Sequence, residues 1–126
     1  MEPLKSAINW FEIPAVDFDR AVRFYSEIYA FDMPTRDMGE VRMGFFQHQQ
    51  GKGIGGAVVF GEGDLPSLNG PKLYLNGGED LSTVLARVTA AGGKIVKEKT
   101  QISPEIGYFG IFDDTEGNRI YVHSMN

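Results

Sequence analysis

The feature that most constrains the fold of this chain is an internal repeat. Residues 8–30 read as a short strand, a turn led by Asp17 and an amphipathic helix, and residues 72–91 show the same order. Four residues of the first half match identical residues 66 positions later: Gly44 and Gly110, Phe46 and Phe112, Gly51 and Gly117, and Ile54 and Ile120. A constant offset indicates a duplicated structural unit. We therefore expect two similar modules.

The first module is predicted to contain four strands and one helix. Alternating residues predict a strand at 6–13, and Asp17 is expected to cap the helix that follows. Further strands are expected at 31–36, 41–48 and 57–60. The glycine-rich segment 51–56 lacks the Lys and Ser or Thr that end a phosphate-binding loop, so it is interpreted as a hairpin turn.

The second module is predicted to repeat this order. A strand at 72–76 precedes a helix that is capped by Glu79 or Asp80 and ended by Gly92 and Gly93. Three strands are expected at 94–99, 108–112 and 119–124. The predicted fold class is α+β, a single domain (1–126) with tandem βαβββ modules at about 6–61 and 72–125 and a linker at 62–71.

Composition narrows the range of functions. Hydrophobic residues make up 42% of the 126 residues and aromatic residues 12%, enough for a core and a lined pocket. The net charge is -5 with scattered Lys and Arg, which argues against nucleic acid and anionic membranes as partners. The absence of cysteine excludes disulfides and thiol chemistry. With no signal or spanning segment apparent, we expect a cytoplasmic location.

Three segments carry a family resemblance: FEIPAVDFDRAVRFYSEIYAF, LARVTAAGGKI and FDDTEGNRIYVHS. In these segments the chain resembles the vicinal oxygen chelate superfamily, which includes glyoxalase I, bleomycin-resistance proteins, fosfomycin-resistance enzymes and extradiol dioxygenases. The resemblance spans residues 8–124. It implies two modules side by side with curved mixed sheets around a cleft, a small-molecule ligand and a homodimer.

The same resemblance implies where a metal would be held. Metal-using members of the superfamily take ligands from the first and last strands of each module, and the matching positions here are Trp10, Gly55, Lys72 and Tyr121. None is His, Asp or Glu, the side chains that offer lone pairs to divalent cations. We therefore expect no metal, and a divalent cation would need relocated ligands.

Strand alternation identifies two candidates for proton transfer. It places Glu12 on the same face as Trp10, and His123 on the same face as Tyr121. Glu12 lies in a run that reads as buried, so we expect it to pair with Lys72 or His123. Glu12 could act as a general base or as a relocated metal ligand, or it could be a structural ion pair or a carboxylate bonded to backbone amides. His123 could be a proton carrier or a structural histidine.

Other side chains are candidates for ligand binding. Trp10, Tyr74 and Tyr121 offer aromatic walls, and Lys72 offers a positive charge to an anionic group. The alternatives are core aromatic residues and a solvent-exposed lysine. His48, in polar company, is expected to be a solvated loop residue.

Two functions follow from these candidates. The leading hypothesis is a metal-independent, glyoxalase-like lyase or isomerase with Glu12 and His123 as its acid and base. The alternative is a non-catalytic binding protein of the drug-sequestering kind, which holds a ligand without transforming it.

Overall fold

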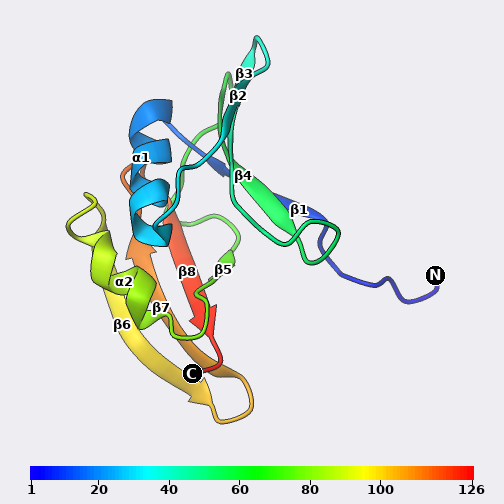
Figure 1. Ribbon diagram of the computed structural model, residues 1–126, viewed down its shortest axis with the longest axis vertical. Coiled ribbons are helices and arrows are strands. Elements are labelled where there is room, and N and C mark those ends of the chain that lie inside the picture. Colours follow the sequence, from blue (N-terminus) through cyan, green and yellow to red (C-terminus); the bar gives the residue numbers. More distant parts are fainter.

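The computed structural model describes residues 1–126 and contains two four-stranded sheets and two helices (Figure 1). The elements are β1 (Trp10–Pro14), α1 (Phe18–Tyr29), β2 (Thr35–Asp37), β3 (Val41–Phe45), β4 (Gly55–Gly61), β5 (Tyr74–Asn76), α2 (Ser82–Val88), β6 (Lys94–Ser103), β7 (Gly107–Asp113) and β8 (Arg119–Ser124). The first sheet has the order β1-β4-β3-β2 and the second has the order β5-β8-β7-β6. The predicted α+β fold with two βαβββ modules is confirmed. Neither helix has the length and apolar content needed to cross a membrane.

The strand register corrects one of the predicted equivalences. In each module the first strand runs parallel to the last, which pairs Trp10 with Gly55 and Tyr74 with Tyr121. Gly55 and Tyr121 stand 66 residues apart in the repeat, so the counterpart of Trp10 is Tyr74 and not Lys72. Tyr74 precedes Asp80 by six positions, whereas Trp10 precedes Asp17 by seven, and the second turn contains Gly78, which has a φ of 79°.

Three strands begin later than predicted, and one of them is β5, which starts at Tyr74 and not at residue 72. β1 starts at Trp10 and not at residue 6, because its partner β4 begins opposite it at Gly55. The preceding residues extend away from the body of the molecule (Figure 1). β2 starts at Thr35 and not at residue 31, and Pro34, just before it, has no N–H to give to a neighbouring strand.

The predicted capping residue is confirmed for α1 only, because the N-cap of α2 is Leu81, which makes no side-chain capping hydrogen bond. The Asp17 carboxylate accepts a hydrogen bond from the backbone N–H of Arg20 at 3.1 Å, which confirms it as the cap of α1. Ahead of α2, Asp80 accepts from the backbone N–H of Ser82 at 2.9 Å. This bond and the ammonium of Lys99 lower the pKa of Asp80 to about 2.

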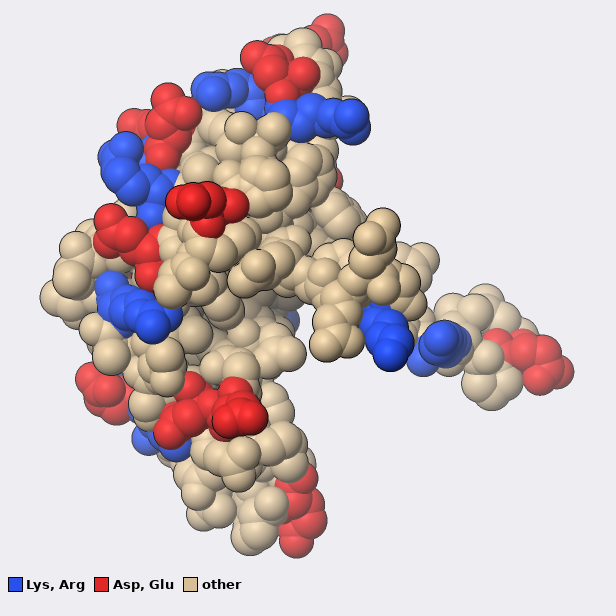
Figure 2. Space-filling view, viewed as in Figure 1, with Lys and Arg blue, Asp and Glu red and all other residues tan.

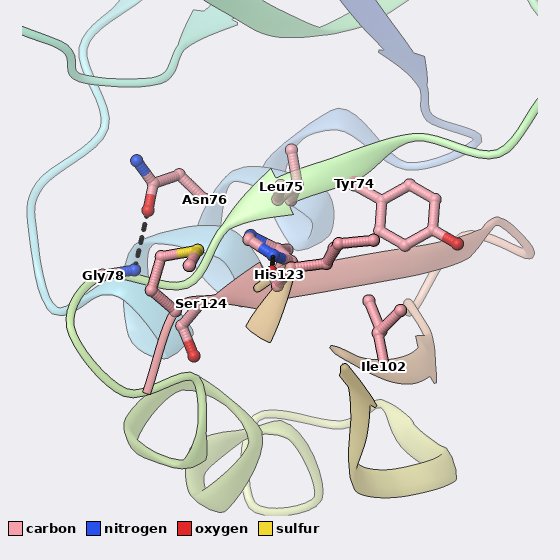
Figure 3. Close-up of a pocket in the computed structure, with 9 residues that line it drawn as sticks. Tyr74, Leu75, Asn76, Gly78, Ile102, His123 and Ser124 are labelled. Atoms are coloured by element: carbon pink, nitrogen blue, oxygen red, sulfur yellow. Dashed lines mark hydrogen bonds between the residues drawn. The ribbon is translucent and has the colours of Figure 1, made fainter. Parts of the chain in front are cut away.

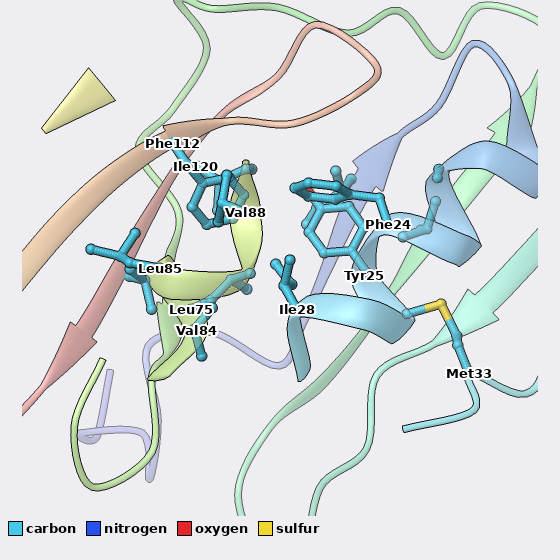
Figure 4. Close-up of a cluster of buried hydrophobic side chains, with 14 of the residues drawn as sticks. Phe24, Tyr25, Ile28, Met33, Leu75, Val84, Leu85, Val88, Phe112 and Ile120 are labelled. Carbon is cyan, nitrogen blue, oxygen red and sulfur yellow. The ribbon is translucent and has the colours of Figure 1, made fainter. Parts of the chain in front are cut away.

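Both modules contribute to one hydrophobic core (Figure 4). The two helices lie together on one side of the sheets and their apolar faces meet there. Phe24 of α1 packs against Phe112 of β7, with ring centroids 5.8 Å apart. Ile13 and Val58 bring the first sheet into the same cluster, so α1 is buried against elements of both modules.

The turn between β7 and β8 fastens the start of α1. The Glu116 side chain has no exposed surface, and its carboxylate accepts hydrogen bonds from the backbone N–H groups of Val16 at 2.9 Å and Asp17 at 2.7 Å. Arg20 adds two bonds to the same carboxylate, at 2.8 and 3.2 Å. A carboxylate of the second module thus satisfies N–H groups at the start of the first helix.

A second buried carboxylate in this turn completes the connection. Asp114 accepts from the backbone N–H groups of Glu116 at 2.8 Å and Asn118 at 2.9 Å, and from the Tyr25 hydroxyl at 2.7 Å. Asn118 donates its side-chain amide to the carbonyl of Pro14 at 2.7 Å. Burial and the nearby charge of Asp114 raise the pKa of Tyr25 well above its ordinary value, so this hydroxyl remains a donor.

Burial of the Glu116 carboxylate acts to raise its pKa, but the hydrogen bonds from Arg20, Asp17 and Thr115 outweigh it. The pKa of Glu116 therefore lies below its ordinary value of 4.5. We predict that Glu116→Gln lowers the free energy of unfolding by about 2 kcal/mol at pH 7, because the amide leaves a charged donor and backbone donors poorly paired. Urea unfolding followed by circular dichroism measures this difference.

The pH dependence supplies a second readout of the same variant. The folded-state pKa of Glu116 is depressed, so the ionised carboxylate makes its full contribution to the free energy of unfolding above pH 4.5. That contribution is lost as the pH falls through the folded-state pKa. The difference in free energy of unfolding between wild type and Glu116→Gln should therefore become smaller in acid. Glu27→Gln, at an exposed position on α1, is the matched control and should change stability little. Equal stability of all three proteins at pH 7 would contradict this account.

Candidate functional site

Each sheet has one face covered by helices and another, here called its open face, that carries the predicted site residues. On the first sheet Trp10 and Glu12 point to the open face, while Ile13 points into the core. On the second sheet Tyr74 and His123 point to the open face. Trp10 is 42% exposed and Tyr74 48%, which is unusual for large aromatic side chains on strands.

A cavity of about 660 Å³ lies on the open face of the second sheet (Figure 3). Tyr74 from β5, His123 from β8 and Ile102 from β6 border it, and Ile106 and Met125 extend its apolar wall. Ile102, Ile106 and Met125 are all exposed. The cavity therefore offers apolar surface that a bound molecule would remove from water.

Three aromatic rings form a row across this open face, called here the aromatic row. The Tyr74 and Tyr121 ring centroids lie 4.9 Å apart, and the Phe109 ring is stacked on Tyr121 at 6.4 Å with an interplanar angle of 12°. The rings come from three adjacent strands in the order β5-β8-β7. Such a row presents flat surfaces on which a planar molecule can stack.

A second cavity, of about 380 Å³, lies between the modules and is lined by residues of β1, the connecting segment and β8. Trp10, Glu12 and Lys72 are among its lining residues. Figure 2 shows the molecule hollowed between the part that carries the N-terminus and the lower part of the body. On the face shown there, basic and acidic side chains are interspersed and form no basic patch.

The structure thus divides the predicted site residues between two cavities. Trp10, Glu12 and Lys72 line the smaller one, whereas Tyr74 and His123 line the larger one. Tyr121 lines neither, but it connects them: its ring lies beside Tyr74, and the Lys72 ammonium sits 5.5 Å from its centroid. Glu12 and His123, the predicted acid and base, do not border a common cavity.

The environment of Glu12 differs from the sequence-based expectation. Its residue is exposed and not buried, because the open face of β1 has no layer packed on it. Glu12 takes part in none of the ion pairs of the structure, so the expected pairing with Lys72 or His123 is absent. Instead its carboxylate accepts a hydrogen bond from the indole N–H of Trp10 at 3.2 Å.

His123 is oriented by the hairpin that connects β6 and β7. Its Nε2 lies 2.5 Å from the carbonyl oxygen of Ile106, an atom that only accepts hydrogen bonds. Nε2 therefore carries a proton, and in the neutral ring Nδ1 is the acceptor.

His48 is a site residue that the sequence did not reveal. Its imidazole lies over Gly55: a Cβ added there would meet Cδ2 and Nε2 of His48 at 2.6 Å and the Trp10 ring at 3.3 Å. His48 is exposed, as expected, but it stands beside Trp10 on the open face. The signal available in the sequence was Gly55, seven positions after His48, because a glycine leaves room above the strand.

The residues at the family's ligand positions do not fit a divalent metal. With the corrected register these positions hold Trp10, Gly55, Tyr74 and Tyr121, which offer no imidazole or carboxylate. No group of three or more His, Cys, Asp or Glu side chains in the structure is arranged to hold a metal ion.

Comparison with known proteins identifies relatives of the whole chain. Residues 7–122 match the model of the Glyoxalase/Bleomycin resistance protein/Dioxygenase superfamily. A "Glyoxylase-like domain-containing protein" of Didymella fabae is 31% identical over 118 residues, 91% of each chain.

Solved structures share the fold at lower identity. TnmS3, an antibiotic binding protein from Streptomyces sp. CB03234, has a TM-score of 0.66 at 22% identity, over 94% of this chain and 95% of that one. Glyoxalase I from Zea mays has a TM-score of 0.68 at 15% identity, over 91% of this chain. The present chain covers only 43% of that glyoxalase I chain.

The residues at the family's ligand positions lead us to predict that the protein does not bind divalent metals. Adding Zn²⁺, Ni²⁺ or Mn²⁺ to EDTA-treated protein should change the melting temperature by less than about 1 °C, whereas a metal at 100 times its Kd would add about 2.7 kcal/mol of stability. Differential scanning fluorimetry measures the shift. A rise of several degrees that disappears in Glu12→Ala or His123→Ala would instead show a metal held by relocated ligands.

Proposed function

Because the chain belongs to the glyoxalase/bleomycin resistance protein/dioxygenase superfamily, we propose that it binds a planar organic small molecule and does not transform it. The observation that carries this proposal is the aromatic row of Tyr74, Tyr121 and Phe109 beside the larger cavity. Exposed aromatic surface next to an apolar cavity favours stacking of a flat ligand.

The physical role of each part of the site follows from its chemistry. Tyr74 and Tyr121 provide the stacking surface, and Ile102 and Met125 provide apolar walls that exclude water. The ammonium of Lys72, 5.5 Å from the centroid of the middle ring, Tyr121, is placed to meet a polar substituent of a molecule stacked on the row. The similarity of fold to an antibiotic binding protein supports this role by analogy.

A homodimer and a cytoplasmic location belong to the same proposal. The exposed aromatic and apolar side chains on both open faces are surfaces that a second copy would cover in part.

We predict that Tyr74→Ala and Tyr121→Ala each weaken binding of a planar probe, 8-anilinonaphthalene-1-sulfonate, by about fivefold, because each removes one stacking partner. Probe fluorescence measures the affinity. Phe60→Ala is the matched control, since Phe60 is an exposed aromatic residue outside both cavities. Trp10→Ala tests the smaller cavity in the same way. Equal effects of Phe60→Ala and Tyr74→Ala would refute stacking on the aromatic row.

The acid and base hypothesis for Glu12 and His123 is the second candidate function. Both side chains are on open faces, and His123 has one ring nitrogen free to accept a proton. The two residues line different cavities, so a reaction that uses both requires a substrate long enough to reach from one to the other.

This candidate predicts that the double variant Glu12→Ala, His123→Ala loses at least about 100-fold in kcat on an identified substrate, as expected for removal of general acid and base groups. Product analysis by mass spectrometry measures turnover. Full turnover by the double variant would end the acid and base hypothesis, and recovery of every tested ligand unchanged would favour sequestration.

A further inference from the structure

The open face of the first sheet carries three groups that stacking on the aromatic row does not use. They are the carboxylate of Glu12, the indole of Trp10 and the imidazole of His48. All three residues are exposed, and they gather around the paired positions Trp10 and Gly55. Their shared property is that each attracts positive charge or accepts hydrogen bonds.

Glu12 presents a carboxylate that is oriented but not neutralised. The Trp10 indole N–H donates to one of its oxygens at 3.2 Å, which fixes the side chain on the open face. The other oxygen has no partner within the protein, and no Lys or Arg nitrogen lies within 4.0 Å of the carboxylate. An oriented carboxylate beside a cavity is a strong acceptor for a charged donor.

The two cations that line this cavity, Lys72 and Arg119, contact groups other than Glu12. The Lys72 ammonium lies over the Tyr121 ring of the second sheet, 5.5 Å from its centroid. Arg119 forms two hydrogen bonds with the Asp113 carboxylate, at 2.9 and 3.1 Å. Neither of them forms an ion pair with the Glu12 carboxylate.

His48 adds a lone pair of fixed direction. Its Nδ1 lies 3.0 Å from the carbonyl oxygen of Gln49 and 3.1 Å from that of Lys52. Both partners only accept hydrogen bonds, so Nδ1 carries the proton and Nε2 is the acceptor in the neutral ring. Nε2 rests over Gly55 next to Trp10 and has no hydrogen-bond partner in the protein.

The aromatic rings complete a surface that attracts cations. The Trp10 and Phe45 rings stand on the same face of the sheet, with centroids 6.3 Å apart and an interplanar angle of 58°. The faces of aromatic rings carry negative charge density and bind ammonium groups, tryptophan most strongly.

From these groups we infer that the open face of the first sheet is a subsite for a protonated amine, with the ammonium held between Glu12, Trp10 and the Nε2 atom of His48. The inference rests on the proposed function, because it names the class of ligand that the protein binds: an aromatic molecule that carries an amine. The unpaired charge of Glu12 disfavours anionic analogues of the same size, and a neutral analogue forms no ion pair with it.

A matched set of probes tests this inference. Benzylammonium, benzyl alcohol and benzoate share one ring and differ in charge, and each is titrated into ¹⁵N-labelled protein. Trp10 is the single tryptophan of the chain, so its indole N–H gives one resolved signal that reports on this subsite alone. Because that N–H donates to Glu12, capture of the carboxylate by an amine shifts the signal directly.

We expect benzylammonium to bind about fivefold or more tightly than benzyl alcohol, and benzoate to bind most weakly. Glu12→Gln keeps an oxygen acceptor for Trp10 but removes the charge, and it should abolish the preference for benzylammonium over benzyl alcohol. His48→Ala should reduce the preference by about half. Glu27→Gln removes the same charge from an exposed position on α1 and should have no effect.

The outcomes separate the two proposals. If benzyl alcohol binds as tightly as benzylammonium and Glu12→Gln changes neither, the amine subsite is wrong while small-molecule binding stands. Tighter binding of benzoate would overturn the inference and point to Lys72 as the anchor. If no probe shifts the Trp10 signal up to its solubility limit and 8-anilinonaphthalene-1-sulfonate also fails to bind, both proposals fail.

Discussion

Two buried carboxylates in the turn between β7 and β8 are the interaction on which the rest of the structure depends. Burying a carboxylate is costly unless its oxygens are hydrogen-bonded, and here Glu116 and Asp114 are fully partnered. Their partners include the first turn of α1 and the Tyr25 hydroxyl, so a turn of the second module sets the position of the first helix. Through α1 it also sets the first sheet against the shared core.

The corresponding turn of the first module is built differently, and this explains why the two open faces are chemically unlike. At the 66-residue offset, His48 stands where the second module has Asp114, and Gln50 stands where it has Glu116. Gly51 and Gly117, which also correspond at this offset, both have positive φ, at 75° and 102°. Without the carboxylates the first turn fastens no helix, and its histidine lies over the open face beside Trp10. The repeat thus supplies a structural turn in one module and a site residue in the other.

Sequence reasoning identified the modules, the order of the elements and the faces of most strands, because a repeat offset and strand alternation are local properties. Sequence reasoning failed where the position or burial of a residue depended on a neighbouring strand or layer. Lys72 was matched to Trp10 by counting along a turn, whereas the register with β8 selects Tyr74. Glu12 read as buried because its strand is apolar, but burial requires a second layer, and the open face of β1 has none.

The sequence by itself determined a duplicated βαβββ fold without imidazole or carboxylate at the usual ligand positions, since both follow from residue identity and spacing. Only the tertiary structure decided which side chains share a cavity. Trp10 and Glu12 are separated from Tyr74 and His123 because their sheets belong to different modules, and the angle between modules is set by long-range contacts such as those of Glu116. His48 lies beside Trp10 because Gly55 has no side chain and leaves space for the imidazole. No local sequence pattern predicts this contact, since it brings a loop residue next to a residue of a strand.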